Sequence, residues 1–324
     1  MGSIPTTPAM YEIKTPEKVF FILLFIVYNN IIFGGYSMKS KVYFTKDISS
    51  EGVLKLYHKI NYKLKGNVCI KVHSGEPGNQ NFLRPSFWED IIEEVDGTVV
   101  ECNTAYKGKR NTTKDHLKTF KLHGWDAFRV DLLDAEGPDL ILDIPSGKVI
   151  NKNYVGKGIE KYDSMLVLSH FKGHPMGGYG GAIKQLSIGL ASSYGKAYIH
   201  GAGVVENIWS ADHDLFLESM ADAALSIIDY FDGNILYVNV MKNMSVDCDC
   251  CAVAEDPCIK DIGVLISTDP IAIDQACIDL VYACKDEKKS HLIERIESRN
   301  GIHTIEAASK LGYGSRDYEL IIID

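Results

Sequence analysis

Residues 164–193 read SMLVLSHFKGHPMGGYGGAIKQLSIGLASS and contain an apolar run, a glycine-rich stretch and a second apolar segment in succession. The run 164–169 has the length and composition of a buried strand. Five glycines follow it, and we expect a helix over 182–193. A strand, a short loop and a helix in this order indicate an α/β fold with parallel strands.

The same alternation of short apolar runs and helical segments continues along the chain. We expect strands at 41–45, 67–73, 98–102, 139–144, 164–169, 235–240, 262–267 and 318–323. We expect helices at 50–63, 85–95, 113–123, 182–193, 214–232, 270–284, 289–299 and 303–311. The sequence therefore predicts an α/β fold with mostly parallel mixed sheets and flanking helices. We expect two lobes, divided near residues 170–200, with the site in the cleft between them.

The composition is that of a globular protein and excludes several classes. The chain has 324 residues, of which 46% are hydrophobic and 24% charged, which excludes disorder, collagen and coiled coil. Its formal net charge of −9 repels nucleic acid and anionic membranes, so we expect neither as a partner. A small anionic ligand would have to be held by a local cluster of positive groups.

Residues 1–37 differ from the rest of the chain. They include the apolar run 19–27, which is too short for a typical transmembrane helix and lacks the flanks of a signal peptide. We interpret 1–37 as an N-terminal extension outside the fold, with a membrane anchor as the alternative, and place the folded domain at 38–324. The eight cysteines favour thiol or metal chemistry in a reducing cytoplasm over disulfides.

The glycine-rich stretch is a candidate anion site. Gly177, Gly178, Gly180 and Gly181 precede the expected helix, and Lys184 lies in its first turn. Free backbone N–H groups at a helix N-terminus bind phosphate and similar anions, so we expect these glycines to bind a cofactor or an anion. The stretch matches neither a dinucleotide fingerprint nor a Walker motif. The alternative is that the glycines only allow close packing.

Polar residues gather where the expected strands end. They are His73, Asn103 and His170, with His174 and His200 further along. Ligands of open α/β sheets bind at the carboxyl ends of the strands, so we expect His73, Asn103 and His170 to contact a cofactor. Imidazoles beside a lysine hold a metal or transfer protons, so His174, Lys184 and His200 are the predicted catalytic residues. The alternative is a structural, hydrogen-bonded histidine at each position.

A dense positive segment at 106–116 follows the strand expected at 98–102. It can clamp a carboxylate or a phosphate, and Arg84 can add a bidentate contact to the cofactor. The alternative is a solvated loop.

Four cysteines fall close together after the strand expected at 235–240. They are Cys248, Cys250, Cys251 and Cys258. Cys248 and Cys251 have Cys-x-x-Cys spacing, which lets two thiolates reach one metal, and Cys250 or Cys258 can supply a third. We expect a catalytic metal ion or an iron–sulfur cluster here, the alternatives being structural zinc or reduced surface thiols. Cys69, Cys277 and Cys284 are expected in the core.

Several segments together resemble the family known as domain of unknown function 362, whose members are often labelled iron–sulfur centre proteins. The segments are IKVHSGEPGN (70–79), ECNTAY (101–106), SHFKGH (169–174), GYGGAIK (178–184), VDCDC (246–250), DIGVL (261–265) and DPIAIDQA (269–276). The resemblance covers about residues 38–324. Many members carry an inserted two-cluster ferredoxin, which has no counterpart here. Any cluster in this chain would have to use the four cysteines of 248–258.

A more remote resemblance concerns the nickel-pincer lactate racemases, in which a lysine and histidines hold the nickel cofactor. By that resemblance His174, Lys184 and His200 would be the corresponding residues.

The leading hypothesis is a cytoplasmic metal- or cofactor-dependent enzyme that acts on a small anionic metabolite. The second is an iron–sulfur or metal-binding redox or metal-handling protein centred on the four cysteines. The third is a ligand-binding protein with structural zinc.

Overall fold

The computed structural model describes residues 39–323, and the described residues from Ser40 onward form one compact unit. The strands are β1 (Ser40–Thr45), β2 (Val68–Lys71), β3 (Thr98–Glu101), β4 (Val130–Leu132), β5 (Leu140–Asp143), β6 (Lys152–Val155), β7 (Ser164–His170), β8 (Lys172–His174), β9 (Gly178–Gly180), β10 (Ile235–Met241), β11 (Gly263–Ser267) and β12 (Tyr318–Ile322). The α-helices are α2 (Ser50–Ile60), α3 (Glu89–Val95), α4 (Thr113–His123), α5 (Ala182–Leu190), α6 (Ser193–His200), α7 (His213–Tyr230), α8 (Pro270–Ala283), α9 (Lys289–Ser298) and α10 (Ile302–Leu311). The 3-10 helices are Pro85–Phe87, Trp125–Ala127, Lys157–Lys161 and Val205–Asn207.

The main sheet of the described residues has eight strands in the order β12-β1-β11-β10-β7-β2-β3-β4. Only β11 runs antiparallel to its neighbours β1 and β10, and the other adjacent pairs are parallel. Every residue of the central strands β7 and β10 is buried. Continuous apolar strands are typical of a parallel sheet that is covered on both faces. The predicted α/β fold with a mainly parallel sheet is therefore confirmed.

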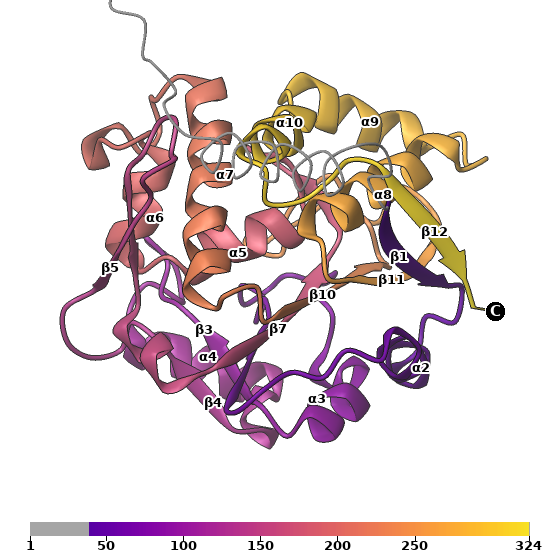
Figure 1. Ribbon diagram of the computed structural model, residues 1–324, viewed down its shortest axis with the longest axis horizontal. Coiled ribbons are helices and arrows are strands. Elements are labelled where there is room, and N and C mark those ends of the chain that lie inside the picture. The colour runs from indigo at the N-terminus through magenta and orange to yellow at the C-terminus, as the bar shows by residue number, and fades with distance from the viewer. Residues whose placement is uncertain (1–38, 324) are drawn as a thin grey trace, which may run out of the picture. The chain divides into compact units, whose positions relative to one another are not determined.

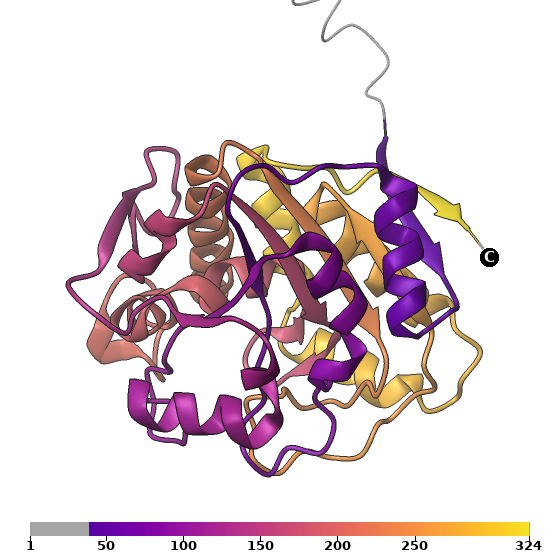
Figure 2. The ribbon, with the colours of Figure 1, turned by 90° about the horizontal axis from the view of Figure 1, so that it is seen from below.

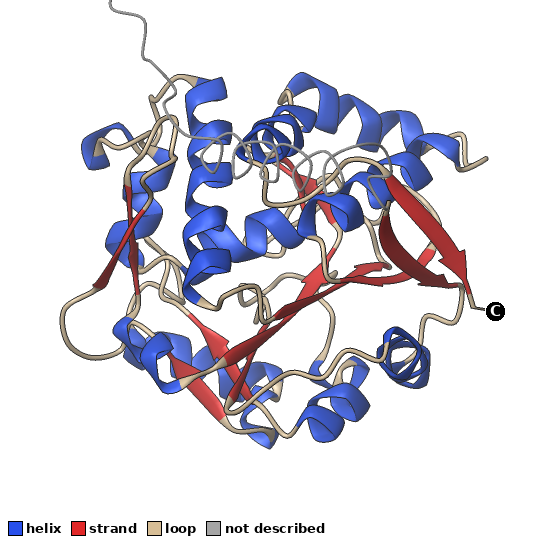
Figure 3. Cartoon of the chain, viewed as in Figure 1, coloured by secondary structure: helices blue, strands red, loops and turns tan. Residues whose placement is uncertain are grey.

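Helices cover both faces of this sheet (Figure 1; Figure 3). One face packs against α5, α7, α8, α9 and α10, and Figure 2 shows α2, α3 and α4 on the other face. Along β7, Met165 and Val167 belong to the first core, whereas Leu166 and Leu168 belong to the second. Successive side chains of a strand point to opposite faces, so one apolar strand serves both cores.

The carboxyl ends of β2, β7 and β10 lie side by side, because β7 pairs in parallel with both β2 and β10. The segments that follow these strands therefore meet at one edge of the sheet. After β7, the chain forms the small antiparallel hairpin β8–β9, in which His174 pairs with Gly178. Gly178 has a φ of +76°, and a Cβ built there would lie 2.8 Å from the Cα of Gly301. The tight turn of the hairpin thus requires glycine at this position.

Several element predictions were wrong in detail. The strand expected at 139–144 is β5, which pairs with β6 in a separate two-stranded sheet rather than in the main sheet. The helix expected at 182–193 ends at Leu190, because Ala191 is extended and Ser192 caps the new helix α6 by accepting a hydrogen bond from Gly195 N at 3.0 Å. β4, β6, β8, β9 and α6 were not predicted. The division into two lobes near 170–200 stays a prediction.

Predictions for residues 1–37 lie outside the described residues. Within 39–323, none of the helices combines the length and the apolar character that crossing a membrane requires.

Candidate metal and anion site

A cavity of about 420 Å³ opens at the carboxyl edge of the sheet. Its walls come from the segments after β2 and β3, from the β8–β9 hairpin, from α5 and α6, and from the loop after β10. Of the residues predicted as functional, it is lined by His73, His174, Lys184, His200, Cys250 and Cys251. The structure therefore brings together residues from five separate parts of the sequence.

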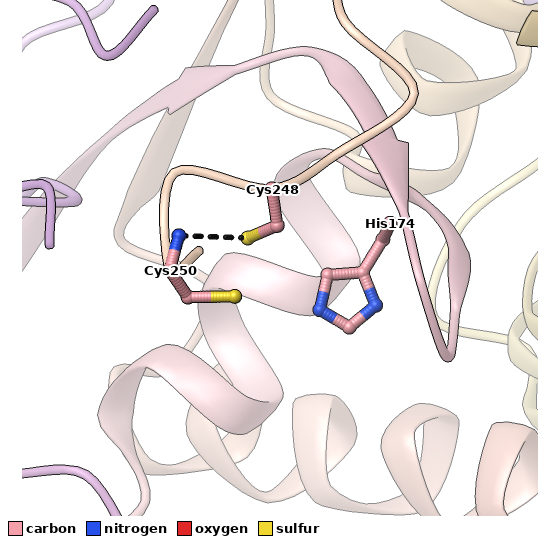
Figure 4. A group of neighbouring side chains, drawn as sticks. All are labelled: His174, Cys248 and Cys250. Carbon is pink, nitrogen blue, oxygen red and sulfur yellow. Dashed lines mark hydrogen bonds between the residues drawn. The ribbon is translucent and has the colours of Figure 1, made fainter. Parts of the chain in front are cut away.

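One group of side chains at this cavity has the composition of a metal site. A nitrogen of His174 and the sulfurs of Cys248 and Cys250 all lie within 4.8 Å of one another. Figure 4 shows the imidazole on the hairpin facing the two sulfurs of the loop after β10. Cys248 is buried, and Cys250 is partly exposed at the cavity wall. Two thiolates and an imidazole are ligands that suit zinc, copper(I) or iron.

The cysteine loop is held in place by hydrogen bonds that the loop after β2 donates to its backbone carbonyls. Glu76 N donates to the carbonyl of Asp249 at 2.8 Å, and Asn79 Nδ2 donates to the carbonyl of Cys251 at 2.8 Å. Within the loop, Cys251 N donates to the carbonyl of Cys248 at 2.9 Å, which closes a turn. These bonds fix the positions from which the sulfurs project.

A buried charge cluster anchors the same loop from the sheet. The Asp249 carboxylate accepts from Lys172 Nζ at 2.8 Å and from His170 Nδ1 at 3.0 Å. The second ring nitrogen of His170 donates to the carbonyl of Lys242 at 2.5 Å. Burial alone would raise the pKa of Asp249, but His170 and Lys172 hold it well below its ordinary value. Asp249 is therefore an anion that ties the cysteine loop to β7 and β8.

The imidazoles nearest the sulfurs are neutral. His174 Nδ1 accepts from Gly177 N at 2.8 Å, and His73 Nδ1 accepts from Gly75 N at 3.1 Å. The other nitrogen of the His174 ring faces the sulfurs of Cys248 and Cys250 (Figure 4). Burial lowers the pKa of both His73 and His174 to about 4. Because Nδ1 accepts a hydrogen bond in both rings, each neutral ring carries its proton on Nε2.

His200 differs from these two rings in its hydrogen bonding. Its Nδ1 donates to the carbonyl of Lys196 at 2.7 Å, and its ring stacks on Phe216 with centroids 5.0 Å apart. No residue within 39–323 hydrogen-bonds its Nε2. Burial lowers the pKa of His200 to about 4. The ring therefore retains an unused Nε2 lone pair, which can accept a proton.

Positive charge is concentrated around the cavity. Lys71 donates to Glu101 at 2.8 Å, while Arg110 donates from Nε to Glu76 at 2.8 Å and lies 3.6 Å from Glu101. Burial alone would raise the pKa of Glu101, but Lys71 leads a set of positive groups that hold it well below its ordinary value. Lys184 Nζ has no hydrogen-bond or ion-pair partner in the described part of the chain.

The helix N-terminus that was expected to bind an anion is occupied by a carboxylate of the chain itself. Asp274 accepts from Ala182 N at 2.7 Å and from Ile183 N at 3.0 Å. A Cβ at Gly181 would lie 2.4 Å from the Asp274 carboxylate, so glycine allows this close approach. The expectation that the first N–H groups of α5 hold an external anion is therefore corrected. Gly180 lies beside the side chains of Lys172 and Lys184. Gly177 donates a hydrogen bond from its backbone N–H to His174 Nδ1.

Four other predicted site residues do not line the main cavity. The Arg84 guanidinium lies over the Phe82 ring, 3.9 Å from its centroid. Asn103 hydrogen-bonds through its side chain to Thr113 and His116. His170 is part of the Asp249 cluster, and the Cys258 thiol donates to the carbonyl of Met244 at 3.3 Å. The contacts of these four residues therefore indicate structural roles.

Sequence reasoning missed several residues of the cavity. Arg110 and Tyr106 line the cavity from the positive segment 106–116, and Trp209 and Lys196 line it from outside every motif of the sequence. The position of Arg110 after a strand end was the available signal. Nothing in the local sequence distinguishes Trp209, which stands in a loop between two helices.

Fold and site together define an α/β protein with a covered, mainly parallel sheet and a thiol–imidazole group at its carboxyl edge. The family described as "Domain of unknown function (DUF362)" matches residues 68–279, so the chain belongs to that family. The resemblance seen in the sequence is confirmed. No curated protein matches this chain.

Two solved structures show distant similarity. The lactate racemase apoprotein from Thermoanaerobacterium thermosaccharolyticum is 20% identical, with 61% of this chain and 50% of that chain covered and a TM-score of 0.38. A structural-genomics protein from Thermotoga maritima is 12% identical, with 81% of this chain and 58% of that chain covered and a TM-score of 0.40. The chain thus spans about half the length of these proteins, and neither likeness is close enough to transfer a function.

Proposed function

We propose that the protein is a metal-dependent enzyme that acts on a small anionic metabolite. The observation that supports this most directly is the His174, Cys248 and Cys250 group, with ligand atoms within 4.8 Å of one another, at a cavity that Lys184 also lines. A metal ion at the group would supply Lewis-acid chemistry beside the bound substrate.

The sulfurs are the principal ligands in this proposal. The Nδ1 lone pair of His174 is used by backbone N–H groups, so the neutral ring carries its proton on Nε2, the nitrogen that faces the sulfurs. Coordination through Nε2 displaces that proton, and deprotonation of the cysteine thiols adds to the proton release. Metal binding should therefore be favoured by rising pH.

The substrate anion would be held by Lys184, with Arg110 deeper in the wall. Among residues 39–323, Lys184 Nζ has no protein partner, and one nitrogen of Arg110, Nη2, is buried without a hydrogen-bond partner. Unsatisfied buried donors are rare in folded proteins and favour an acceptor supplied from outside. His200 lines the same cavity with an open Nε2 and would move a proton to or from the substrate.

The test is the metal content of the full chain, purified without oxygen and without a polyhistidine tag. We expect about one metal ion per chain in the wild type and its loss in Cys250→Ser. Cys258→Ser is the matched control, because that thiol lies in the same loop but outside the ligand group. A metal-free wild type, or equal metal in all three proteins, would overturn the proposal.

An iron–sulfur or metal-handling protein is the second candidate. It is favoured by one observation: Cys248, Cys250 and Cys251 share one turn, in which Cys250 N donates to the Cys248 sulfur at 3.4 Å and Cys251 N donates to the Cys248 carbonyl at 2.9 Å. A cluster bound by three cysteines keeps one iron open. Acid-labile sulfide with iron, and a visible absorbance that dithionite bleaches and Cys251→Ser removes, would establish this candidate in place of the first.

A further inference from the structure

The residues that line the cavity are positively charged in its interior and aromatic at its mouth. Its interior wall contains Arg110, which is 2% exposed, and Lys71, which is fully buried. Trp209, which also lines the cavity, is 65% exposed and therefore stands at the mouth. The cations lie deep and the largest apolar surface lies outside.

The deep end has an unused donor for an anion. Arg110 Nε is bonded to Glu76, but Arg110 Nη2 is buried and has no hydrogen-bond partner in the described residues. A guanidinium nitrogen without an acceptor loses its hydration without compensation. An oxygen of a phosphate or carboxylate matches the planar guanidinium group and would satisfy it.

The mouth has the features of a platform for a ring. The Trp209 indole lies beside the Tyr106 phenol, with ring centroids 6.1 Å apart and planes tilted by 53°. It also lies 6.4 Å from the ring of His200. These contacts leave most of the indole exposed to solvent. An exposed indole at a cavity mouth gains stability when a planar apolar group covers it.

The volume of the cavity also exceeds the needs of a bare anion. Its value of about 420 Å³ falls within the range of roughly 300–1,000 Å³ that is typical of pockets for drug-sized ligands. A phosphate or carboxylate alone would leave most of this space to water. A body attached to the anion would fill it.

We infer that the cavity binds an anion joined to a planar ring, with the phosphate or carboxylate at Arg110 and Lys184 and the ring against Trp209 at the mouth. This inference rests on the proposed function, because it specifies the class of the anionic substrate. It adds a recognition role for Trp209 and Tyr106, which the metal site does not require.

The test compares ligands that differ only by the ring. Titration calorimetry on the full chain measures the affinity for each ligand. The affinity for inorganic phosphate is compared with that for phenyl phosphate, and the affinity for acetate with that for phenylacetate. We expect the ring to increase affinity at least tenfold in one of the two pairs, and the pair in which it does so identifies the anion. Trp209→Ala should remove most of that gain while leaving the affinity for the bare anion within about twofold, because the indole contacts the ring alone.

Two further variants separate the affinity due to the ring from the affinity due to the anion. Tyr194→Ala is the matched control, because Tyr194 is an aromatic residue, 50% exposed, that does not line the cavity, and it should keep the full gain. Lys184→Ala should weaken the bare anion and the ring-bearing anion by the same factor. Equal affinity within both pairs, or an unchanged gain in Trp209→Ala, would overturn the inference.

The same experiment distinguishes the inference from the proposed function. Bare anions that bind without any gain from the ring would overturn the inference and leave the proposed function standing. Binding of neither member of either pair would overturn both the inference and the anion part of the proposal. A ring-dependent gain in a protein that carries no metal would support the inference and overturn the metal part alone.

Discussion

The carboxylate of Asp249 accepts a hydrogen bond from His170 Nδ1 at 3.0 Å across 79 positions of sequence. Because Asp249 stands between Cys248 and Cys250, this bond and the ion pair with Lys172 fix the loop that carries the candidate metal ligands. The positions of the sulfurs are therefore set by a buried charge cluster, before any metal binds. Preorganised ligands lower the cost of binding a metal.

Replacement of Asp249 should destabilise the fold. In Asp249→Asn the buried groups of His170 and Lys172 lose their counter-ion, and removal of one partner of a buried ion pair typically costs about 3–5 kcal/mol. Urea unfolding followed by circular dichroism measures the change. Asp256→Asn is the control, because Asp256 is exposed on the same loop, and we expect a change within about 0.5 kcal/mol. Equal stabilities of the two variants would refute the anchoring role.

Lys184→Ala should reduce anion affinity without reducing stability. Its Nζ has no partner in the described residues, so its removal breaks no contact of the fold. Hydrogen bonds to charged groups contribute about 1.5–3 kcal/mol, which corresponds to a loss of roughly 10- to 100-fold in affinity for phosphate. Calorimetry gives the affinity and thermal unfolding gives the stability.

The control for that change is Lys310→Ala on α10, an exposed lysine outside the cavity. It should bind phosphate as the wild type does. An unchanged affinity in Lys184→Ala would show that the anion is held elsewhere.

His200 should make the protein sensitive to acid. Burial lowers the pKa of His200 to about 4, from 6.5 in the unfolded chain, so below pH 6.5 the unfolded chain takes up a proton that the folded protein refuses. The stability that the neutral ring contributes is complete above pH 6.5 and is lost as the pH falls toward 4. Between pH 7 and pH 5 this loss amounts to about 2 kcal/mol.

The measurement is urea unfolding at pH 7 and pH 5. His200→Gln should lose about 2 kcal/mol less than the wild type over that interval, because glutamine does not titrate. His58→Gln on α2 removes an exposed histidine and should lose as much as the wild type. A wild-type pH dependence in His200→Gln would contradict the burial of a neutral ring.

The sequence was sufficient to predict the central strands and the residues that follow them. The runs at β7 and β10 are apolar along their whole length because both faces of the sheet are covered, and this pattern is visible without a structure. Because those strands are parallel neighbours, His174 and the cysteine loop had to meet at one edge. That topology explains why the sequence could predict that His174 and the cysteine loop lie at the same edge of the sheet, while their roles stay predictions.

Other parts depend on contacts that local sequence does not encode. β4 has only three residues, Val130–Leu132, and forms through its pairing with β3. Asp274 occupies the N-terminus of α5 from 92 positions away, so the glycine loop alone gave a misleading anion site. Arg110 becomes a cavity residue only because Glu76 and Glu101, from two other segments, hold it there.

Removal of the metal should lower the melting temperature but leave the protein folded at 25 °C. A ligand at 100 times its dissociation constant stabilises a protein by about 2.7 kcal/mol, which corresponds to a shift of roughly 5 °C for a domain of this size. The Asp249 cluster and the bonds from Glu76 and Asn79 hold the cysteine loop without a metal, so chelation should leave the circular dichroism spectrum unchanged. Dialysis against a chelator, followed by circular dichroism at 25 °C and thermal unfolding, gives the spectrum and the melting temperature.

Cys250→Ser should melt at the same temperature before and after chelation, whereas Cys258→Ser should show the wild-type shift. Unfolding of the wild type on chelation at 25 °C would instead identify the metal as structural zinc, because only a metal on which the fold depends unfolds the chain when it leaves.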